Sequence, residues 1–274
     1  MKHVNTSLTF SKPEQGQKNG PLITVVTVVF NGKDCLEETI QSVIGQTYDH
    51  IEYIIIDGGS TDGTQDIIKK NENNIHCWIS EQDNGIYDAM NKGIKIAKGE
   101  WINFMNAGDT FNSSDVLAKV FYHKKYDEDI LYGDVHVRYP EFSRIQSAGF
   151  PCHLWRGMQF SHQSILVRSA IHKLNFFDTT NLIAADFQFF YESYNNNIKF
   201  KYIEQTLASV ASGGISDYER IKTIDAWRHV VCSTDSALLT RLYYSFLKMN
   251  VIAKDVLKRI LPKKIKNTVI ANKK

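Results

Sequence analysis

Residues 22–30 read Leu-Ile-Thr-Val-Val-Thr-Val-Val-Phe, and this run decides the fold class. A continuous run of β-branched apolar residues is typical of a strand buried on both faces, as in a parallel sheet. Asn31-Gly32 ends the run, and Asp34 can cap a helix over residues 36–45. The apolar residues of that segment recur at helical spacing, as Leu36, Ile40, Val43 and Ile44.

The same alternation of strand and helix continues as far as residue 105. The sequence predicts strands over residues 51–56, 76–80 and 101–105, and helices over residues 64–70 and 87–97. This order predicts a mostly parallel central sheet flanked by helices, in which ligands bind at the carboxyl ends of the strands. The polar clusters of this half fall at those ends, at Asn31 and at residues 57–62, 81–88 and 106–109.

The second half of the chain is less regular. We predict strands over residues 130–139 and 164–168, a helix over residues 186–195, and a long strand or strand pair over residues 200–211. Helix is expected from residue 219 onward, with a break near Pro262. The chain therefore divides into an N-terminal arm (residues 1–20, with a short strand near residues 8–10), an α/β domain (21–218) and a helical, basic tail (219–274).

Composition narrows the class of protein. The chain has 274 residues, of which 43% are hydrophobic, and this is enough for one large α/β core. Its four cysteines form no CxxC pair, which argues against a zinc site and a dense disulfide framework. The first twenty residues lack the apolar core of a signal peptide, and no run of eighteen apolar residues exists. We therefore expect a cytoplasmic protein.

Charge is distributed unevenly along the chain. The formal net charge is +2, but residues 254–274 carry eight basic residues and one acidic residue, a net +7 that leaves −5 for the remainder. Apolar residues are interleaved with these lysines, so we predict peripheral contact with an anionic membrane. A solvated helix packed on the protein body is the alternative. The nearly neutral total does not indicate a nucleic-acid partner.

Residues 57–62, Asp-Gly-Gly-Ser-Thr-Asp, follow a predicted strand and precede a predicted helix. Glycines at such a turn let a ligand approach the backbone, and the carboxylates can accept hydrogen bonds from a base or a ribose. An ordinary turn with a helix cap explains the same residues.

Residues 106–109, Asn-Ala-Gly-Asp, end another apolar strand. A carboxylate at this place can hold Mg²⁺ or Mn²⁺ while substrate phosphates supply further ligands. A simple turn is the alternative.

Asp186 lies within Ala184-Ala185-Asp186-Phe187-Gln188-Phe189-Phe190. A carboxylate among apolar neighbours is costly unless it is partnered or functional. A helix N-cap is the alternative, and the two roles are compatible. His162, Gln163 and Trp155 combine polar and aromatic groups that suit a sugar or a phosphate, and they could line an acceptor pocket.

Taken together, these motifs resemble the inverting family 2 glycosyltransferases of the GT-A fold. Residues 24–31 look like the first nucleotide-binding strand of that family, and residues 57–64 are similar to its Asp-Gly-Ser-Thr-Asp-Gly-Thr loop. Several further stretches resemble a subgroup that builds colanic acid, capsule and O-antigen chains, namely residues 80–93, 106–109, 132–134, 162–163 and 213–216. The resemblance covers about residues 22–216.

The resemblance implies transfer of a sugar from a nucleotide-diphosphate donor, a UDP-sugar by default. The acceptor would be a hydroxyl of a glycan or a lipid-linked molecule in bacterial surface polysaccharide biosynthesis. Asp186 would be the catalytic base and Asp109 the metal ligand for Mg²⁺ or Mn²⁺. His162, Gln163 and Trp155 would bind the acceptor. The donor-binding set would be Phe30, Asn31, Asp57, Gly59, Asp62, Glu81, Asp83, Asp88 and Asn106.

The sequence departs from the family pattern in its metal motif. Asn106 and Gly108 stand at positions that are often acidic in the family, so Asp109 is the only carboxylate of its loop. A non-catalytic sugar-nucleotide-binding module is therefore an alternative. A nucleotidyltransferase is disfavoured because residues 31–33 lack a Gly-rich loop with arginine, and a Rossmann dehydrogenase because the first turn lacks GxGxxG. No Gln-x-x-Arg-Trp motif is present, which argues against a processive synthase.

Overall fold

A computed structural model describes residues 1–4, 20–214, 218–234 and 237–260 of the chain. The described residues form two compact units. The first contains residues 1–154 and 158–212, and the second contains residues 155–157 together with the residues from Gly213 onward. Each unit is described by itself below.

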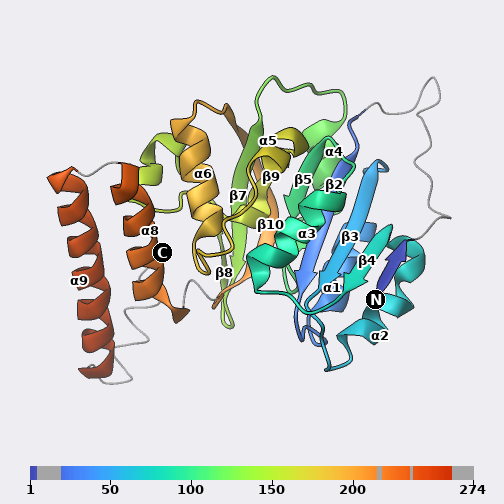
Figure 1. The fold of residues 1–274 in the computed structure, drawn as a ribbon, viewed down its shortest axis with the longest axis horizontal. Coiled ribbons are helices and arrows are strands. Elements are labelled where there is room, and N and C mark those ends of the chain that lie inside the picture. Colours follow the sequence, from blue (N-terminus) through green and yellow to red (C-terminus); the bar gives the residue numbers. More distant parts are fainter. Residues whose placement is uncertain (5–19, 215–217, 235–236, 261–274) are drawn as a thin grey trace. The chain divides into compact units, whose positions relative to one another are not determined.

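The described residues of the first unit build one ten-stranded mixed sheet (Figure 1). Its strand order is β1-β4-β3-β2-β5-β9-β7-β10-β6, and β8 pairs with β7. The strands are β1 (Lys2–Val4), β2 (Ile23–Val29), β3 (Ile51–Asp57), β4 (Cys77–Ser80), β5 (Trp101–Phe104), β6 (Thr110–Phe111), β7 (Ile130–Arg138), β8 (Ser143–Gln146), β9 (Ile165–Arg168) and β10 (Phe200–Ala211).

The expected parallel arrangement holds for β4-β3-β2-β5 and for the pair β7 and β10. All seven residues of β2 are buried, as the β-branched run predicted, because this strand lies inside the sheet and is covered on both faces. The sheet as a whole is mixed, since β9 runs antiparallel to both of its neighbours, β5 and β7. Because of this reversal, the residues that precede β9 lie beside the residues that follow β5, at the carboxyl ends of the parallel strands.

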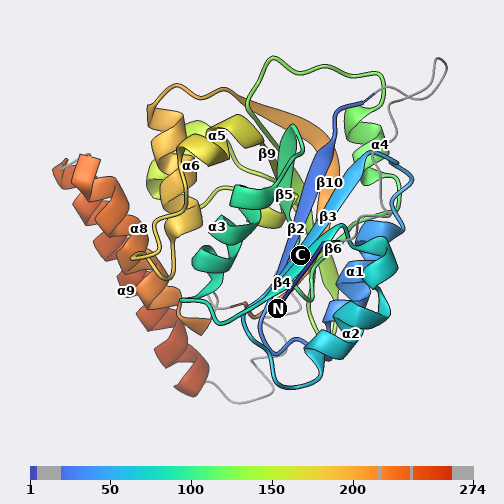
Figure 2. The same ribbon diagram turned by 45° about the vertical axis from the view of Figure 1, so that its right-hand side comes forward.

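Helices cover both faces of the sheet, as Figure 2 shows: α3 (Ile86–Ile96), α5 (Ser169–Leu174) and α6 (Ala185–Asn195) lie on one face, and α1 (Leu36–Ile44), α2 (Thr64–Lys70) and α4 (Val116–Phe121) on the other. The first unit also contains the short 3-10 helices η1 (Glu72–Asn74) and η3 (His162–Ser164), and η2 (Pro151–Arg156) begins in the first unit and ends in the second. The α/β fold class and the predicted strands and helices of the first half are confirmed, with shifts of one or two residues at their ends.

Some local features differ from the expectations, one expectation lies outside the described residues, and the long strand expected over residues 200–211 is confirmed. The N-terminal arm contributes strand β1, which pairs antiparallel with β4, whereas the strand expected near residues 8–10 lies outside the described residues. The sequence did not predict β6, β8, α4 or α5. The cap of α1 is Cys35 rather than Asp34, and no side chain makes a capping hydrogen bond there. Residues 200–211 form one strand with register shifts between Tyr202 and Ala208.

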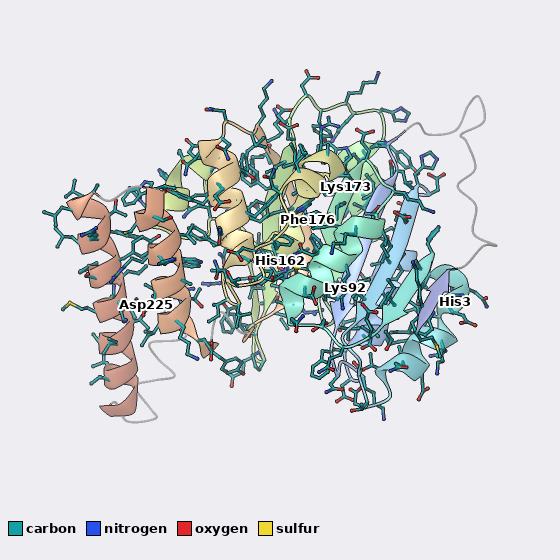
Figure 3. All side chains as sticks on the ribbon, viewed as in Figure 1. His3, Lys92, His162, Lys173, Phe176 and Asp225 are labelled. Atoms are coloured by element: carbon teal, nitrogen blue, oxygen red, sulfur yellow. The ribbon has the colours of Figure 1, made fainter. Side chains whose placement is uncertain are left out.

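The second unit is helical and contains α8 (Arg220–Thr234) and α9 (Leu238–Ile260). Tyr244 is buried on α9, and its hydroxyl donates a hydrogen bond of 3.0 Å to the carbonyl of Trp155. Asp225 of α8, labelled in Figure 3, pairs with Lys248 of α9 at 2.6 Å. In the described part of the chain, no helix combines the length and apolarity that crossing a bilayer requires.

Candidate active site

Asp57 closes β3 and is fully buried. Its carboxylate accepts hydrogen bonds from the hydroxyl of Ser60 and, at 2.6 Å, from the hydroxyl of Ser80 at the end of β4. The amide of Ser60 also points at both carboxylate oxygens, at 3.2 Å. These contacts fix the loop of residues 57–60 against the neighbouring strand, so the carboxylate of Asp57 positions the loop.

Asn31 and Asp62 make hydrogen bonds between the segment that follows β2 and the loop that follows β3. Asn31 adopts a left-handed backbone (φ 49°), and its side-chain oxygen accepts a hydrogen bond from the amide of Thr61 at 3.1 Å. The carboxylate of Asp62 accepts hydrogen bonds from the Thr64 hydroxyl and from the amides of Lys33 and Thr64, which lowers the pKa of Asp62 to about 2. The preceding ring, Phe30, is 66% exposed and is therefore free to stack on a base.

The loop of residues 81–88 lies against the loop of residues 57–60. A Cβ atom on Gly58 would come within 2.5 Å of Asp83 Oδ2, and one on Gly59 within 3.3 Å of the Gln82 backbone. Lys92, labelled on α3 in Figure 3, pairs with Glu81 at 3.0 Å and with Asp88 at 3.7 Å. The acidic side chains of Glu81 and Asp83 in this loop, and of Asp88 in the first turn of α3, therefore gather beyond the carboxyl ends of β3 and β4, and Lys92 partly neutralises them.

The loop of residues 106–109 turns sharply at Gly108 (φ 93°). Thr39 of α1 accepts a hydrogen bond from the Gly108 amide at 2.9 Å and donates one to the Asp109 carbonyl at 2.8 Å. Gln163 donates to Asp109 Oδ2 at 2.6 Å. Burial raises the pKa of Asp109, and the hydrogen bond from Gln163 and the nearby His162 oppose that rise.

The oxygen atoms of this loop suit a hard divalent cation only in part. No group of three or more His, Cys, Asp or Glu side chains suited to a metal occurs among the described residues. Asn106 Oδ1 is nevertheless buried without a hydrogen-bond partner, in the same turn as Asp109. Mg²⁺ is commonly held by one or two protein oxygens, with substrate phosphates as further ligands. Asn106 Oδ1 and the Asp109 carboxylate therefore fit a metal ion whose remaining ligands come from a bound diphosphate.

Asp186 lies in the first turn of α6, one residue after the helix begins. The N-cap position belongs to Ala184, and no side chain makes a capping hydrogen bond there. Asp186 Oδ1 accepts hydrogen bonds from the Tyr87 hydroxyl at 2.9 Å and from the Phe187 amide at 2.8 Å. The helix-cap interpretation of Asp186 is therefore wrong, and the side chain has long-range partners instead.

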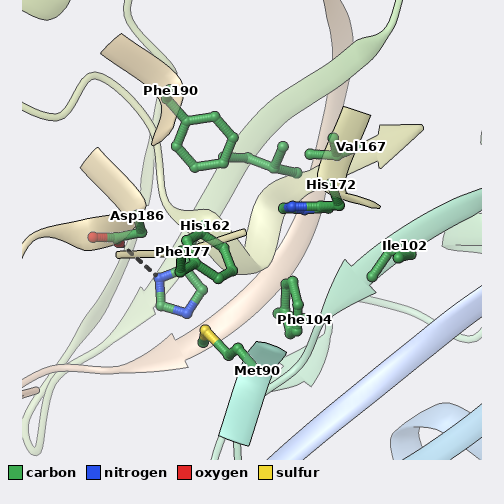
Figure 4. Close-up of a pocket in the computed structure, with 10 residues that line it drawn as sticks. Met90, Ile102, Phe104, His162, Val167, His172, Phe177, Asp186 and Phe190 are labelled. Carbon is green, nitrogen blue, oxygen red and sulfur yellow. Dashed lines mark ion pairs between the residues drawn. The ribbon is translucent and has the colours of Figure 1, made fainter. Parts of the chain in front are cut away.

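His162 connects Asp186 to the loop of residues 106–109. Its Nδ1 atom lies 3.4 Å from Asp186 Oδ2, and its Nε2 atom lies 2.9 Å from the side-chain nitrogen of Asn106. An amide nitrogen only donates, so Nε2 accepts this hydrogen bond, and the neutral ring then carries its proton on Nδ1, facing Asp186. Figure 4 shows this contact as a dashed line.

Opposing effects set the ionisation of Asp186, whose side chain is 19% exposed. Burial favours the neutral acid, but the contacts from His162, Tyr87 and the Phe187 amide outweigh burial and lower the pKa of Asp186. Burial and the adjacent Asp186 charge raise the pKa of Tyr87, which keeps its hydroxyl a donor. Asp186 is therefore a carboxylate at neutral pH, with a small exposed edge that can accept a proton.

A small, mostly apolar pocket adjoins this carboxylate (Figure 4). Its walls include Met90, Phe104, Phe177 and Phe190. Burial lowers the pKa of His172, which also lines the pocket, to about 3, so this ring is uncharged at neutral pH. His172 therefore adds no charge beside Asp186, and the polar partners named above are what hold that carboxylate ionised.

A scan against protein-family models matches residues 24–184 to a model described as Glycosyl transferase family 2. The chain belongs to this family. The matched segment contains the loops of residues 57–62, 81–88 and 106–109 together with His162, and it ends two residues before Asp186.

Curated relatives of this family 2 member share part of its length. It is 41% identical over 102 residues to a glycosyltransferase of Mycobacterium tuberculosis that is named as uncharacterized, covering 37% of this chain and 39% of the relative. It is 38% identical over 102 residues to TuaG of Bacillus subtilis, provisionally named a teichuronic acid biosynthesis glycosyltransferase, covering 36% and 40%. The matches thus span less than half of either relative.

Solved glycosyltransferase structures share the fold. The mannosyltransferase PcManGT from Pyrobaculum calidifontis, solved with GDP-Man and Mn²⁺, has a TM-score of 0.62 and 16% identity over 81% of this chain and 67% of that chain. S. aureus TarS, solved with UDP, has a TM-score of 0.59 and 17% identity over 78% and 66%. These likenesses confirm the expected GT-A fold.

The structure gathers most, but not all, of the residues that the sequence singled out in this family 2 chain. The strand-end loops and Asp186 lie in the first unit, as expected from the sheet. The side chains of His162 and Gln163, which were predicted to bind an acceptor, contact Asn106, Asp186 and Asp109. Trp155 lies in the helical unit against the Tyr243 ring, and its acceptor role stays a prediction.

Sequence reasoning missed several residues of the site, among them Thr39, Tyr87 and Arg138. Tyr87 donates to Asp186, and Arg138 of β7 donates to the carbonyl of Gly108 at 2.8 Å. Tyr87 stood inside the quoted run of residues 80–93, but its partner is 99 residues away, and only the folded chain identifies it.

The lowered pKa of Asp186 predicts how stability depends on pH. In the unfolded chain this group titrates near 3.8, and in the folded protein it titrates lower. Its ionisation thus stabilises the folded state above the unfolded pKa, and the contribution disappears as pH falls through the folded pKa. In urea unfolding from about pH 5 to about pH 2, the free energy of unfolding should fall less steeply for Asp186→Asn than for wild type. Parallel curves would contradict the assignment.

Proposed function

We propose that this chain transfers a sugar from a nucleotide-diphosphate donor to an acceptor hydroxyl, with inversion at the anomeric carbon. The observation that carries the proposal is the ionised Asp186 carboxylate, held by His162 and Tyr87 and linked through His162 to the loop of residues 106–109. A proton acceptor beside a loop suited to a metal and a diphosphate is what such a transfer requires.

The donor would lie along the carboxyl ends of β2, β3, β4 and β5. The exposed ring of Phe30 and the polar group of Asn31 would face the base. Asp57, Gly59 and Asp62 would shape the floor of that site, and the loop that holds Glu81, Asp83 and Asp88 would close its other side. A UDP-sugar is the proposed donor, and the TarS structure with UDP and the PcManGT structure with GDP-Man are examples of nucleotide binding by this fold.

Asp109 and the unpartnered oxygen of Asn106 would hold Mg²⁺ or Mn²⁺ together with the donor diphosphate. When bound, the cation would supply positive charge that stabilises the departing diphosphate. Gln163 orients the Asp109 carboxylate through its 2.6 Å hydrogen bond, and Thr39 fixes the backbone of the loop. These residues would therefore set where the diphosphate lies relative to Asp186.

Asp186 would take the proton of the acceptor hydroxyl. The acceptor oxygen forms a bond to the anomeric carbon as the bond from that carbon to the diphosphate oxygen breaks, and the nucleoside diphosphate leaves. The lowered pKa keeps Asp186 deprotonated but makes it a weak base. The proton therefore moves once bonding to the anomeric carbon has made the hydroxyl acidic. His162 is a positioning residue in this scheme, because it acts through Asp186.

The acceptor is proposed to be a glycan or lipid-linked hydroxyl of a bacterial surface polysaccharide, at the cytoplasmic face of the membrane. The name of the relative TuaG, which refers to teichuronic acid biosynthesis, supports this class of product. Within the first unit, His162 and Gln163 would contribute to acceptor binding, and Trp155 is proposed for the same role from the sequence alone. Peripheral contact with an anionic membrane would bring the enzyme to a lipid-linked acceptor.

Replacing Asp186 by Asn tests the catalytic assignment. Asn can still accept the hydrogen bond from Tyr87 but cannot take the acceptor proton. Turnover at saturating donor should fall by about 10² to 10⁴, the usual range for loss of a general base, while donor affinity persists. The assay measures release of nucleoside diphosphate, after a thermal-shift screen of nucleotide sugars with Mn²⁺ has identified a donor that binds.

Glu192→Gln is the matched control, because it makes the same carboxylate-to-amide change at an exposed position of the same helix. A rate for Asp186→Asn within a few-fold of that control would remove Asp186 from the mechanism. Donor binding by the wild type without any turnover on a panel of glycan and lipid-linked acceptors would instead favour the non-catalytic binding module.

Asp109→Ala tests the metal assignment. Loss of the only carboxylate of this loop should abolish the increase in donor affinity that Mn²⁺ produces, as measured by isothermal titration with and without the metal. Asp115→Ala is the control, because Asp115 is a half-exposed carboxylate six residues further along the chain that pairs with Lys119 at 2.8 Å. An unchanged response to Mn²⁺ in Asp109→Ala, with both variants equally folded, would place the metal elsewhere.

A further inference from the structure

Helix α9 carries a continuous row of exposed apolar side chains, which we call the outer stripe. The row recurs at helical spacing of three and four residues, so its members share one face of the helix. Their exposed fractions range from 44% to 79%. The outer stripe consists of Leu238, Leu239, Leu242, Phe246, Met249, Ile252, Val256 and Leu257.

The outer stripe is distinct from the face by which α9 packs on α8. That packing face includes Thr240 and Tyr244, which are 4% and 1% exposed, and Lys248, which pairs with Asp225 of α8. Figure 3 shows side chains of α9 projecting on the side that faces away from α8. Among the described residues, helix α9 therefore packs within its unit through one face and leaves the apolar outer stripe exposed.

An uncovered apolar row of this length calls for a binding partner. Monomeric soluble proteins rarely expose a large contiguous apolar patch, and those that do commonly use it to bind a protein or a membrane. Single exposed leucines need no such explanation, but eight large apolar residues on one face of one helix do.

Charge selects between these two classes of partner. From residue 256 to residue 274 the sequence contains seven basic residues and no acidic one, a net +7 that leaves −5 for the rest of the chain. A second copy of this chain carries the same positive segment, and like charges repel. An anionic bilayer surface attracts the same segment, and lysines and arginines beside an apolar helix face are the signature of a helix lying in the membrane interface.

We propose that the outer stripe docks α9 on an anionic membrane, with the helix axis in the plane of the bilayer. Helix α9 lies on the membrane rather than crossing it, since no described helix is long and apolar enough to cross. This inference deepens the membrane contact of the proposed function, but it requires no transfer chemistry. Vesicle binding and sugar transfer can therefore succeed or fail independently of each other.

Co-sedimentation of the full chain with vesicles tests the proposal. The chain should bind vesicles of mixed phosphatidylglycerol and phosphatidylcholine, and bind pure phosphatidylcholine weakly. The triple variant Leu239→Ser, Leu242→Ser, Phe246→Ser should lose at least about tenfold in vesicle affinity, because it removes apolar contact. Leu174→Ser is the matched control, since Leu174 and Leu239 are equally exposed at 79% and Leu174 lies on α5.

A second variant tests the charge. Lys263→Gln, Lys264→Gln and Lys266→Gln together should lower affinity for anionic vesicles at low salt by roughly tenfold or more and remove most of its salt dependence. Binding of the stripe variant equal to that of Leu174→Ser would overturn the proposal, as would equal affinity for neutral and anionic vesicles. A lipid-free dimer that the stripe variant converts to a monomer, with no vesicle binding by wild type, would assign the stripe to a second copy.

Discussion

The imidazole of His162 between Asn106 and Asp186 is the contact on which the candidate site depends. It joins a loop at the end of β5 to the first turn of α6, two segments that are 80 residues apart in the sequence. A neighbouring hydrogen bond, from Gln163 to Asp109, connects η3 to the loop of residues 106–109 a second time. Two adjacent residues thus contact the carboxylates of Asp186 and Asp109.

The antiparallel insertion of β9 makes this contact possible. In a purely parallel sheet, the residues before a strand lie at the edge opposite the ligand site. Because β9 is antiparallel to β5, residues 162 and 163, which precede β9, lie beside the carboxyl end of β5. The buried amide of Asn103 secures this edge by donating to the carbonyls of Gln163 and Ile165, at 3.0 and 2.8 Å. Sheet topology, rather than local sequence, therefore places His162 beside Asp186.

The first half of the fold could be predicted because its signals are local. The buried β-branched run of β2 and the alternation that follows it fix strands, helices and strand ends without knowledge of distant partners. The missed elements depend on pairing. Strand β6 has only two residues and is defined by its pairing with β10. Strand β8 is exposed along its whole length, so its sequence shows no alternation of buried and exposed residues.

The site was predictable in part, for the same reason. Asp186 stood out because a carboxylate among apolar residues needs a partner, but the sequence could not say that Tyr87 and His162 are those partners. Asp57 was predicted to contact the donor, whereas the structure shows its carboxylate engaged with Ser60 and Ser80. A turn motif identifies which residues gather at a strand end, and packing decides which of them face outward.

A double-mutant cycle on the single-turnover transfer rate tests most directly whether His162 acts through Asp186. The rates of wild type, His162→Ala, Asp186→Asn and the double variant are measured at saturating donor. Residues that act as one unit are strongly non-additive, so the double variant should be about as slow as Asp186→Asn alone. Two independent losses that multiply in the double variant would contradict the account, because His162 would then contribute to transfer without Asp186.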